Sequence, residues 1–500
     1  MKDNKIRLTL ALGLTAVLLA ACSDSNDSPA TPVEPTFLAI AQPLVEDPPE
    51  VGQPSLLATT FDLADVGYEQ REFFLSGDAS AFTNLSELGV DGAWEVEAGE
   101  TAPYRTRVII YRPIDPADFS GTVMMEWLNV TAGFETPPSY GSGHVEILRS
   151  GHVWVGVSAQ LIGIEGSDRG LLPLHLKAAN PERYESLAHP GDSFSYDIFS
   201  QAAQALREPE TTDLLPGLAV ERLIALGESQ SAGRLVSYIN AIQPLYNPFD
   251  GYMVHSRGGS SSALAQEPLT AIPTPDGVRI RTDINVPVLN FQTETDLLVL
   301  GSVSSRQDDN DRFRLWETTG SAHGDYYSFV SGRADTGEDP QFAVVVEVDS
   351  IFGFINCDQP MNAGSMPWIF NAALRSLDTW VRDGTAPPEA PRLDLNDSMT
   401  AFIKDELGNV TGGIRTPYVD SAAAILSGEN QSGRESFCFL FGSTALFDAT
   451  QMAQLYVDQA GYEAAVSEAA DDAVAKGFLL AEDAERIKAA ATLQWQALGT

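Results

Sequence analysis

Basic residues are scarce in this sequence. Its 500 residues include 30 Lys and Arg against 69 Asp and Glu, which gives a formal net charge of −39. A surface of that sign repels nucleic-acid phosphates and anionic lipid head groups, so the composition argues against nucleic-acid binding. The sequence also lacks a glycine-rich phosphate loop or a dinucleotide fingerprint beside any predicted strand. We therefore expect neither a nucleic-acid partner nor a nucleotide cofactor.

Cysteine is scarce as well, with only Cys22, Cys357 and Cys438. Neither of the two later cysteines has a ligand-type residue at close spacing, which argues against a metal site. In an exported chain such an even pair suggests a disulfide, with two separate buried thiols as the alternative. The acidic run at 308–311 does not have the spacing of an EF-hand and favours a solvated loop. No metal is expected.

Long apolar runs are absent except at the beginning of the chain. Residues 8–21 follow three basic residues and have the length of a signal-peptide core, too short to span a bilayer as a helix. They end in Leu-Ala-Ala-Cys at 19–22, which resembles the lipobox of bacterial lipoproteins and implies lipid attachment at Cys22. An ordinary secretory signal is the alternative. Ser23 favours the outer membrane, on the periplasmic or cell-surface side, with the lipid as the sole membrane contact.

The next segment is polar and interrupted by prolines. Residues 22–60 show no hydrophobic periodicity and are typical of a flexible tether. The folded body is therefore predicted to span residues 61–500, and no internal repeat is visible in it. That length suits one large domain with insertions, or two domains.

Short apolar runs alternate with amphipathic segments along the body. Helices are expected at residues 195–207 and 232–242, which carry apolar residues at helical spacing. Strands alternating with helices indicate the α/β class, with a mostly parallel sheet covered on both faces. The predicted strands are residues 104–112, 121–128, 152–158, 222–226, 251–255, 286–292 and 312–317.

The sequence of the last third of the chain, from about 360 to 500, predicts a helical extension. Residues 367–382 form an amphipathic helix, and further helices from 445 onward break near Gly461 and Gly477. Two interpretations remain open: an extra helical layer packed on the body, or a cap over the active site.

One segment indicates nucleophilic catalysis. A buried strand ends at Gly227 and a helix begins shortly after it, so Ser229 falls on a sharp strand-turn-helix that would expose its hydroxyl. Such a turn needs small residues two positions before and after the serine. Gly227 meets the first demand, and Ser231 stands where glycine is usual. Ser231 is the alternative nucleophile.

A serine hydroxyl needs a base that is oriented by an acid, in the chain order serine, acid, histidine. His323 follows a predicted strand in a glycine-flanked loop and is the candidate base, whereas His255 precedes any plausible acid. The loop after the strand at 286–292 supplies the acid. Asp296 has the expected offset, and Glu294 is the alternative.

Two backbone N–H groups should stabilise the oxyanion that forms during acyl transfer. One belongs to Gln230, directly after the nucleophile. The other should come from the loop at 129–133, with Val130 as the candidate.

Several of these pieces resemble a bacterial family known as the α/β-hydrolase domain-containing proteins. The resemblance rests on EWLNV at 126–130, GVSAQ at 156–160, DSFSYDI at 192–198, GESQS at 227–231, HSRGG at 255–259 and AHGD at 322–325. It covers nearly all of the chain after Phe61 and implies hydrolysis of carboxylic esters. Arg257, near the expected site, is a candidate for binding a substrate carboxylate, with a structural ion pair as the alternative.

The sequence thus predicts a serine esterase that acts on a small-molecule ester by a two-step acyl-enzyme mechanism without a cofactor. Two other functions remain: an amidase or peptidase that uses the same three residues, and a surface lipoprotein that binds a ligand without catalysis.

Overall fold

A computed structural model describes residues 37–499 except 169, 210, 211, 352, 354, 430 and 432–436. The predicted signal peptide and Cys22 lie outside the described residues. Within residues 37–499, less those gaps, no helix is both long and apolar enough to cross a membrane.

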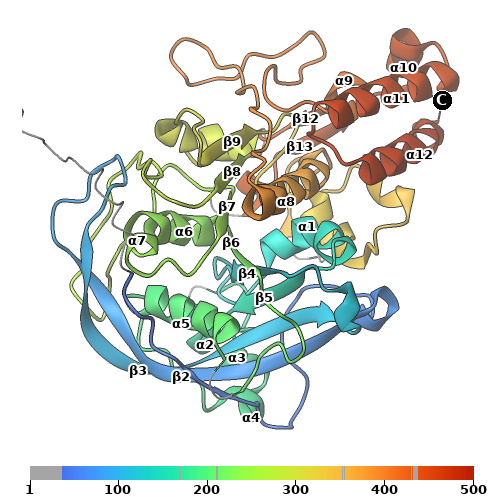
Figure 1. Cartoon of the computed structure of the whole chain (residues 1–500). Coiled ribbons are helices and arrows are strands. Elements are labelled where there is room, and N and C mark those ends of the chain that lie inside the picture. Colours follow the sequence, from blue (N-terminus) through green and yellow to red (C-terminus); the bar gives the residue numbers. More distant parts are fainter. Residues whose placement is uncertain are drawn as a thin grey trace, which may run out of the picture. The chain divides into compact units, whose positions relative to one another are not determined.

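One nine-stranded sheet organises the chain, in the order β1-β2-β3-β5-β4-β6-β7-β8-β9 (Figure 1). The strands from β5 to β9 pair in parallel, and β1, β2 and β3 extend the sheet in antiparallel pairing beyond β5. Their bounds are β1 Leu44–Glu46, β2 Tyr68–Asn84, β3 Val96–Pro113, β4 Thr122–Trp127, β5 Val153–Val157, β6 Arg222–Glu228, β7 Gly251–His255, β8 Val288–Gln292 and β9 Phe313–Glu317.

All seven predicted strands are confirmed, because strands that are buried on both faces read as continuous apolar runs. β1 and β2 were not predicted. β1 lies inside the segment expected to be a tether, yet it pairs with β2, and Val45 and Ala58 are buried. The folded part therefore begins before residue 61, because residues 44–46 are paired with the sheet edge.

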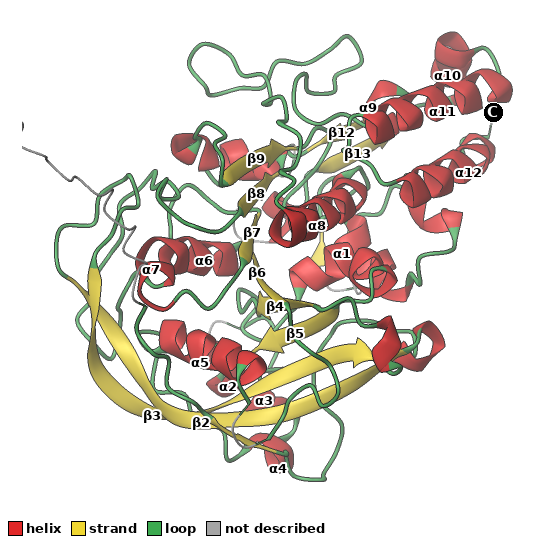
Figure 2. Cartoon of the chain, in the orientation of Figure 1, coloured by secondary structure: helices red, strands yellow, loops and turns green. Residues whose placement is uncertain are grey.

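Helices cover both faces of the sheet (Figure 2). On one face α5 (Ser195–Arg207) and α6 (Gln230–Ala241) bury their apolar sides, and on the other face α1 (Pro138–Arg149) and α8 (Met366–Asp383) do so. This arrangement confirms the predicted α/β class. Shorter helices complete the connections: α2 Leu161–Glu165, α3 Leu176–Ala179, α4 Pro181–Tyr184, α7 Gln243–Tyr246 and α9 Pro417–Asp420.

The C-terminal helices form a separate packed layer. α11 and α12 share an apolar cluster with the β12–β13 hairpin. The helices break at Val457 and Asp458 and again at 476–480, which confirms the predicted breaks near Gly461 and Gly477. Asp458 begins α11 because its carboxylate accepts the N–H of Gly461, 2.9 Å away. The elements are α10 Ala449–Tyr456, α11 Gln459–Ala475, α12 Ala481–Ala497, with the hairpins β10 Ser350–Ile351 and β11 Ile355–Asn356, and β12 Ala424–Ser427 and β13 Ser443–Leu446.

α8 does not belong to that layer, although the predicted extension begins before it. Its apolar side, including Phe370, Leu374 and Leu377, is buried in the same cluster as residues of the central strands. Asp378 also accepts a hydrogen bond from Thr122 Oγ1 of β4 at 2.6 Å. The helix is therefore part of the main sheet's cover.

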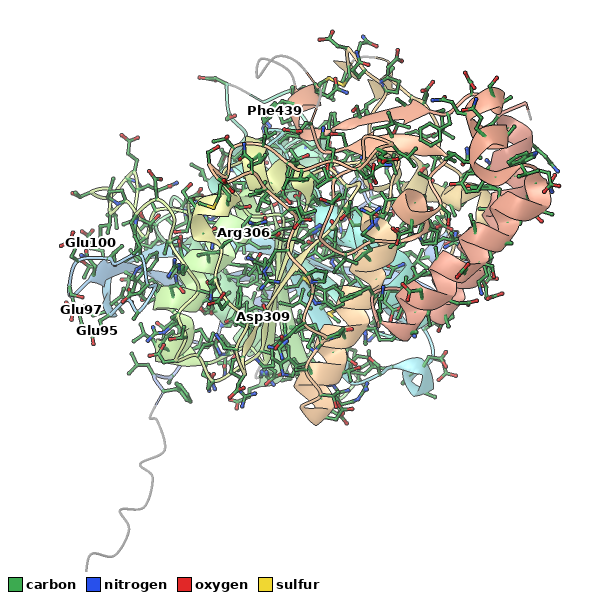
Figure 3. All side chains as sticks on the ribbon, turned by 90° about the horizontal axis from the view of Figure 1, so that it is seen from above. Glu95, Glu97, Glu100, Arg306, Asp309 and Phe439 are labelled. Carbon is green, nitrogen blue, oxygen red and sulfur yellow. A yellow bond between two sulfur atoms is a disulfide. The ribbon has the colours of Figure 1, made fainter. Side chains whose placement is uncertain are left out.

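The acidic surface is visible at the far end of the β2–β3 pair, where Glu95, Glu97 and Glu100 are exposed at the edge of the molecule (Figure 3). In the acidic run at 308–311, by contrast, Asp309 pairs with Arg392 at 2.7 Å. No group of three potential metal ligands occurs among the residues that the structure describes.

Candidate active site

Ser229 occupies the turn between β6 and α6. Its backbone has φ 61° and ψ −118°, a region that L-residues rarely adopt, and its N–H donates to the carbonyl of His255 at 2.9 Å. A Cβ at Gly227 would lie 2.9 Å from Leu235 Cδ1 and 3.0 Å from the carbonyl oxygen of Ser231. The tight turn that presents the Ser229 hydroxyl therefore requires glycine at position 227.

Ser231, the alternative nucleophile, lies inside α6. It is fully buried, and its hydroxyl has no hydrogen-bond partner among the described residues. The small side chain fits where glycine is usual, but it does not line the cavity that Ser229 lines.

Three predicted residues come together in one hydrogen-bonded chain. His323 Nε2 lies 2.8 Å from Ser229 Oγ, and His323 Nδ1 lies 2.6 Å from Asp296 Oδ1. His323 is in the loop after β9, and Asp296 is in the helical turn Thr295–Val299 after β8. Because β6, β8 and β9 are parallel, their carboxyl ends bring these side chains to one edge of the sheet.

The structure separates the two candidate acids. Asp296 is fully buried, and its second oxygen accepts the N–H and the hydroxyl of Thr293 at 2.7 and 2.8 Å. Glu294 instead accepts the N–H groups of Gly320 and Gly428, both at 2.7 Å. Glu294 thus holds two loops together and makes no contact with His323, which contradicts its alternative role as the acid.

A residue that the sequence interpretation missed is Glu228. Its Oε1 lies 3.3 Å from His323 Nε2, and its side chain is only 6% exposed. Burial raises the pKa of Glu228 to about 8. Burial alone would lower the pKa of His323, but the carboxylates of Glu228 and Asp296 outweigh it and raise that pKa to about 8. Glu228 directly precedes the serine in the sequence, so its position could have indicated a role at the site. The sequence interpretation used only the glycine and serine positions of the motif.

The two predicted N–H donors lie beside Ser229. Val130 and Gln230 line one cleft with it, and within the described part of the chain neither N–H has a hydrogen-bond partner. Asn129 fixes the first of them, because its amide donates to the carbonyl of Glu228 at 3.0 Å and its oxygen accepts the N–H of Thr131 at 2.8 Å. The loop is thereby tied to the strand that carries the serine.

Two hollows meet at Ser229. The first, the apolar cavity, has a volume of about 150 Å³ and is lined mainly by hydrophobic side chains together with His323. The second, the polar cleft, is open and larger, at about 950 Å³. Apolar side chains around the cavity include Phe134, Phe329, Ile351, Leu440 and Phe441, and polar side chains around the cleft include Gln160, Asp192, Gln230, Arg234, Ser261 and Asp276.

The predicted disulfide joins two segments that border the apolar cavity. Cys357, after β11, is bonded to Cys438 in the Phe437–Leu440 turn. Ile355 and Leu440, close to the two cysteines, line the cavity. Of the described residues in α10, α11 and α12, none does so, and those helices therefore form a packed layer and not a cap.

Arg257 and His255 lie near the strand ends but do not take part in the site. Arg257 is buried and donates to the carbonyls of Gly258 and Val278, which contradicts both a role in binding substrate and the alternative of a structural ion pair. The ring of His255 stacks on Phe370 of α8 with 4.1 Å between centroids, and burial lowers its pKa well below the usual value. His255 is therefore a neutral core residue.

Among solved structures, the chain shows low-identity similarity to proteins named as esterases. Acetyl xylan esterase 1 from Thermoanaerobacterium sp. JW/SL YS485 is 10% identical, with 55% of this chain and 81% of that chain covered and a TM-score of 0.29. A glucuronoyl esterase from Solibacter usitatus is 11% identical, with 55% and 83% covered and a TM-score of 0.26. No curated protein matches the chain.

A family match covers far more of the sequence. Residues 42–489 match the family described as the alpha/beta hydrolase domain, and they include every strand of the main sheet together with Ser229, Asp296 and His323. The match begins before residue 61, in agreement with the position of β1. This chain belongs to the alpha/beta hydrolase domain family.

Proposed function

We propose that the protein is a serine hydrolase that cleaves carboxylic esters. The observation that carries the proposal is the chain of hydrogen bonds from Asp296 through His323 to Ser229, on a strained turn that opens into an apolar cavity. This arrangement supplies a nucleophile, a base and an orienting acid in the geometry that acyl transfer needs.

In the first step, Ser229 Oγ attacks the ester carbonyl while His323 Nε2 takes the hydroxyl proton. The N–H groups of Gln230 and Val130 would stabilise the negative charge that develops on the carbonyl oxygen. Asp296 keeps Nδ1 protonated and stabilises the imidazolium. His323 then gives its proton to the departing alcohol, and the acyl group stays on Ser229.

In the second step, water replaces the alcohol. His323 takes a proton from the water as its oxygen attacks the acyl-enzyme, and the proton returns to Ser229 Oγ as the acid is released. The net reaction consumes one ester and one water and yields one acid and one alcohol.

A matched pair of substrates tests the proposal against the two rival functions. We expect the protein to hydrolyse p-nitrophenyl butanoate and to leave the matching amide, N-(4-nitrophenyl)butanamide, nearly unchanged. A fluorophosphonate should also label Ser229, as located by mass spectrometry of the digested protein. Comparable turnover of the anilide would favour an amidase, and the absence of both labelling and turnover would favour a ligand-binding protein.

The position of Glu228 predicts an unusual pH dependence. The base form of His323 is needed for the first step, so kcat/KM should rise with pH through a midpoint near the raised pKa of about 8. Glu228 and His323 lie 3.3 Å apart, both have a pKa raised to about 8, and they therefore titrate as a coupled pair. Replacing Glu228 with Gln removes the carboxylate that raises the pKa of His323, so the midpoint should move to lower pH. The measurement is kcat/KM for p-nitrophenyl butanoate across pH 5 to 10.

The high-pH plateau serves as the internal control for that variant. A plateau within about threefold of wild type would show an intact site, because a shift in pKa alone does not change the rate of the fully deprotonated form. An unchanged midpoint would mean that Glu228 does not act on His323.

A further inference from the structure

The polar cleft contains a buried guanidinium with unused donors. The Arg234 side chain is 5% exposed, and its Nη2 donates to Asp192 at 2.8 Å. Its Nε and Nη1 have no partner among the residues that the structure describes. A buried donor left unpaired is costly, so such groups mark places where a ligand or a water completes the hydrogen bonding.

Two other residues that line the same cleft carry buried, unpaired oxygens. Gln230 Oε1 is an acceptor and Ser261 Oγ both donates and accepts, and neither has a partner in the described part of the chain. The described residues that line the cleft therefore carry both unpaired donors and unpaired acceptors. A hydroxyl group, which both donates and accepts, matches such a mixture better than a carboxylate or an ammonium does.

The charges in the cleft also favour a neutral ligand. Asp192 already offsets the positive charge of Arg234, and it also accepts hydrogen bonds from the N–H of Leu161 and the amide of Gln160. Asp276 adds a further acidic residue to the lining. A second anion would meet no net positive charge here, and the net charge of −39 would disfavour its approach.

We propose that the polar cleft binds a hydroxylated half of the ester substrate, while a compact apolar half occupies the apolar cavity. This inference rests on the proposed ester hydrolysis and specifies its substrate class. Ser229 lines both hollows, so an ester carbonyl placed at Oγ would direct its two halves into them. Phe439, labelled in Figure 3, comes from the Phe437–Leu440 turn and adds an apolar surface to the cleft.

The position of His323 indicates which hollow holds the acid half of the ester and which holds the alcohol half. His323 must protonate the departing alcohol, and it lines the apolar cavity but not the polar cleft. We therefore expect the alcohol half to lie in the cavity and the hydroxylated half to be the acid.

Two matched pairs of esters test this substrate class. Ethyl 2,3-dihydroxybutanoate and ethyl butanoate differ only in hydroxyls on the acid half. Glyceryl monobutanoate and propyl butanoate differ only in hydroxyls on the alcohol half. For each pair, the ratio of kcat/KM for the hydroxylated ester to that for the plain ester is compared between wild type and variants, which cancels the intrinsic reactivity of the esters.

We expect Ser261→Ala to lower the ratio for the first pair about three- to tenfold, as for the loss of one neutral hydrogen bond. Arg234→Lys should lower it by about tenfold or more, because a lysine paired with Asp192 keeps the charge but lacks the Nε and Nη1 donors of the guanidinium. Ser304→Ala is the matched control: this serine lines the same cleft, but its hydroxyl already donates to the carbonyl of Gly301 at 2.8 Å.

Each outcome decides between stated alternatives. A fall in the ratio for the second pair alone would keep the hydroxylated half in the cleft but assign it to the alcohol. Ratios in Ser261→Ala that equal those of Ser304→Ala for both pairs would overturn the inference, and ordered water would then fill the cleft. Failure to hydrolyse p-nitrophenyl butanoate would instead contradict the proposed ester hydrolysis itself.

Discussion

Replacing Ser229 with Ala is expected to lower kcat for p-nitrophenyl butanoate by about 10⁶. Without the hydroxyl no acyl-enzyme forms, and His323 has no nucleophile to deprotonate at 2.8 Å. The residual rate would come from the N–H groups of the oxyanion site and from substrate binding. The measurement is steady-state hydrolysis by purified protein, with the variant at high enough concentration to detect the residual rate.

Ser231→Ala is the matched control, because it removes a hydroxyl two residues away that is buried and has no partner in the described structure. We expect this variant to keep a kcat close to wild type. Loss of activity in Ser231→Ala with full activity in Ser229→Ala would reverse the assignment of the nucleophile.

Asp296→Asn is expected to lower kcat by about 10⁴ while leaving the fold intact. The second oxygen of Asp296 accepts two hydrogen bonds from Thr293, so the asparagine oxygen should keep that position and its NH₂ group should face His323 Nδ1. The imidazole would then carry its proton on Nε2, where it can no longer accept the proton of Ser229. The rate of p-nitrophenyl butanoate hydrolysis near pH 8 measures the effect.

Asp325→Asn makes the same chemical change two residues after His323. Asp325 is buried, and its Oδ1 accepts the N–H and the hydroxyl of Ser328 while its Oδ2 has no described partner, so an NH₂ group fits there. We expect little change in kcat. Full activity in Asp296→Asn combined with a large loss in Glu294→Gln would return the role of the acid to Glu294.

The sequence predicts the parts of this site that depend on local patterns. The run from Leu223 to Gly227 indicates a buried strand, and a strand followed by Ser229 and a helix is a strand-turn-helix. His323 and Asp296 follow apolar strands at the offset that parallel pairing needs. These inferences use short local patterns together with the chain order of serine, acid and histidine.

The choice between Asp296 and Glu294 is different, because it depends on distant residues. Glu294 is kept from His323 by the N–H of Gly428, which lies 134 residues later in the chain. Arg257 was misjudged for the same reason, since the carbonyl of Val278 that it binds is brought close only by the fold. No local pattern in the sequence reports such contacts.

β2 escaped prediction because its sequence, YEQREFFLSGDASAFTN, mixes polar and apolar residues without regular alternation. It pairs with β3 through an irregularity in register between Ser80 and Phe82, so the side-chain pattern shifts along its length. The apolar cavity could not be predicted from the sequence either, because its walls come from segments as far apart as Leu57 and Phe441.

The position of α8 limits how far this protein can be shortened. A fragment ending soon after the His323 loop would contain all three residues of the hydrogen-bonded chain, yet it would lack Phe370, Leu374 and Leu377. Each such side chain stabilises the fold by about 1.5–3 kcal/mol when it is buried. Removing these side chains would also expose the apolar side chains of the central strands to water. Such a fragment should aggregate, so an active version would have to retain α8, and it would also need Leu440 and Phe441 to line the apolar cavity.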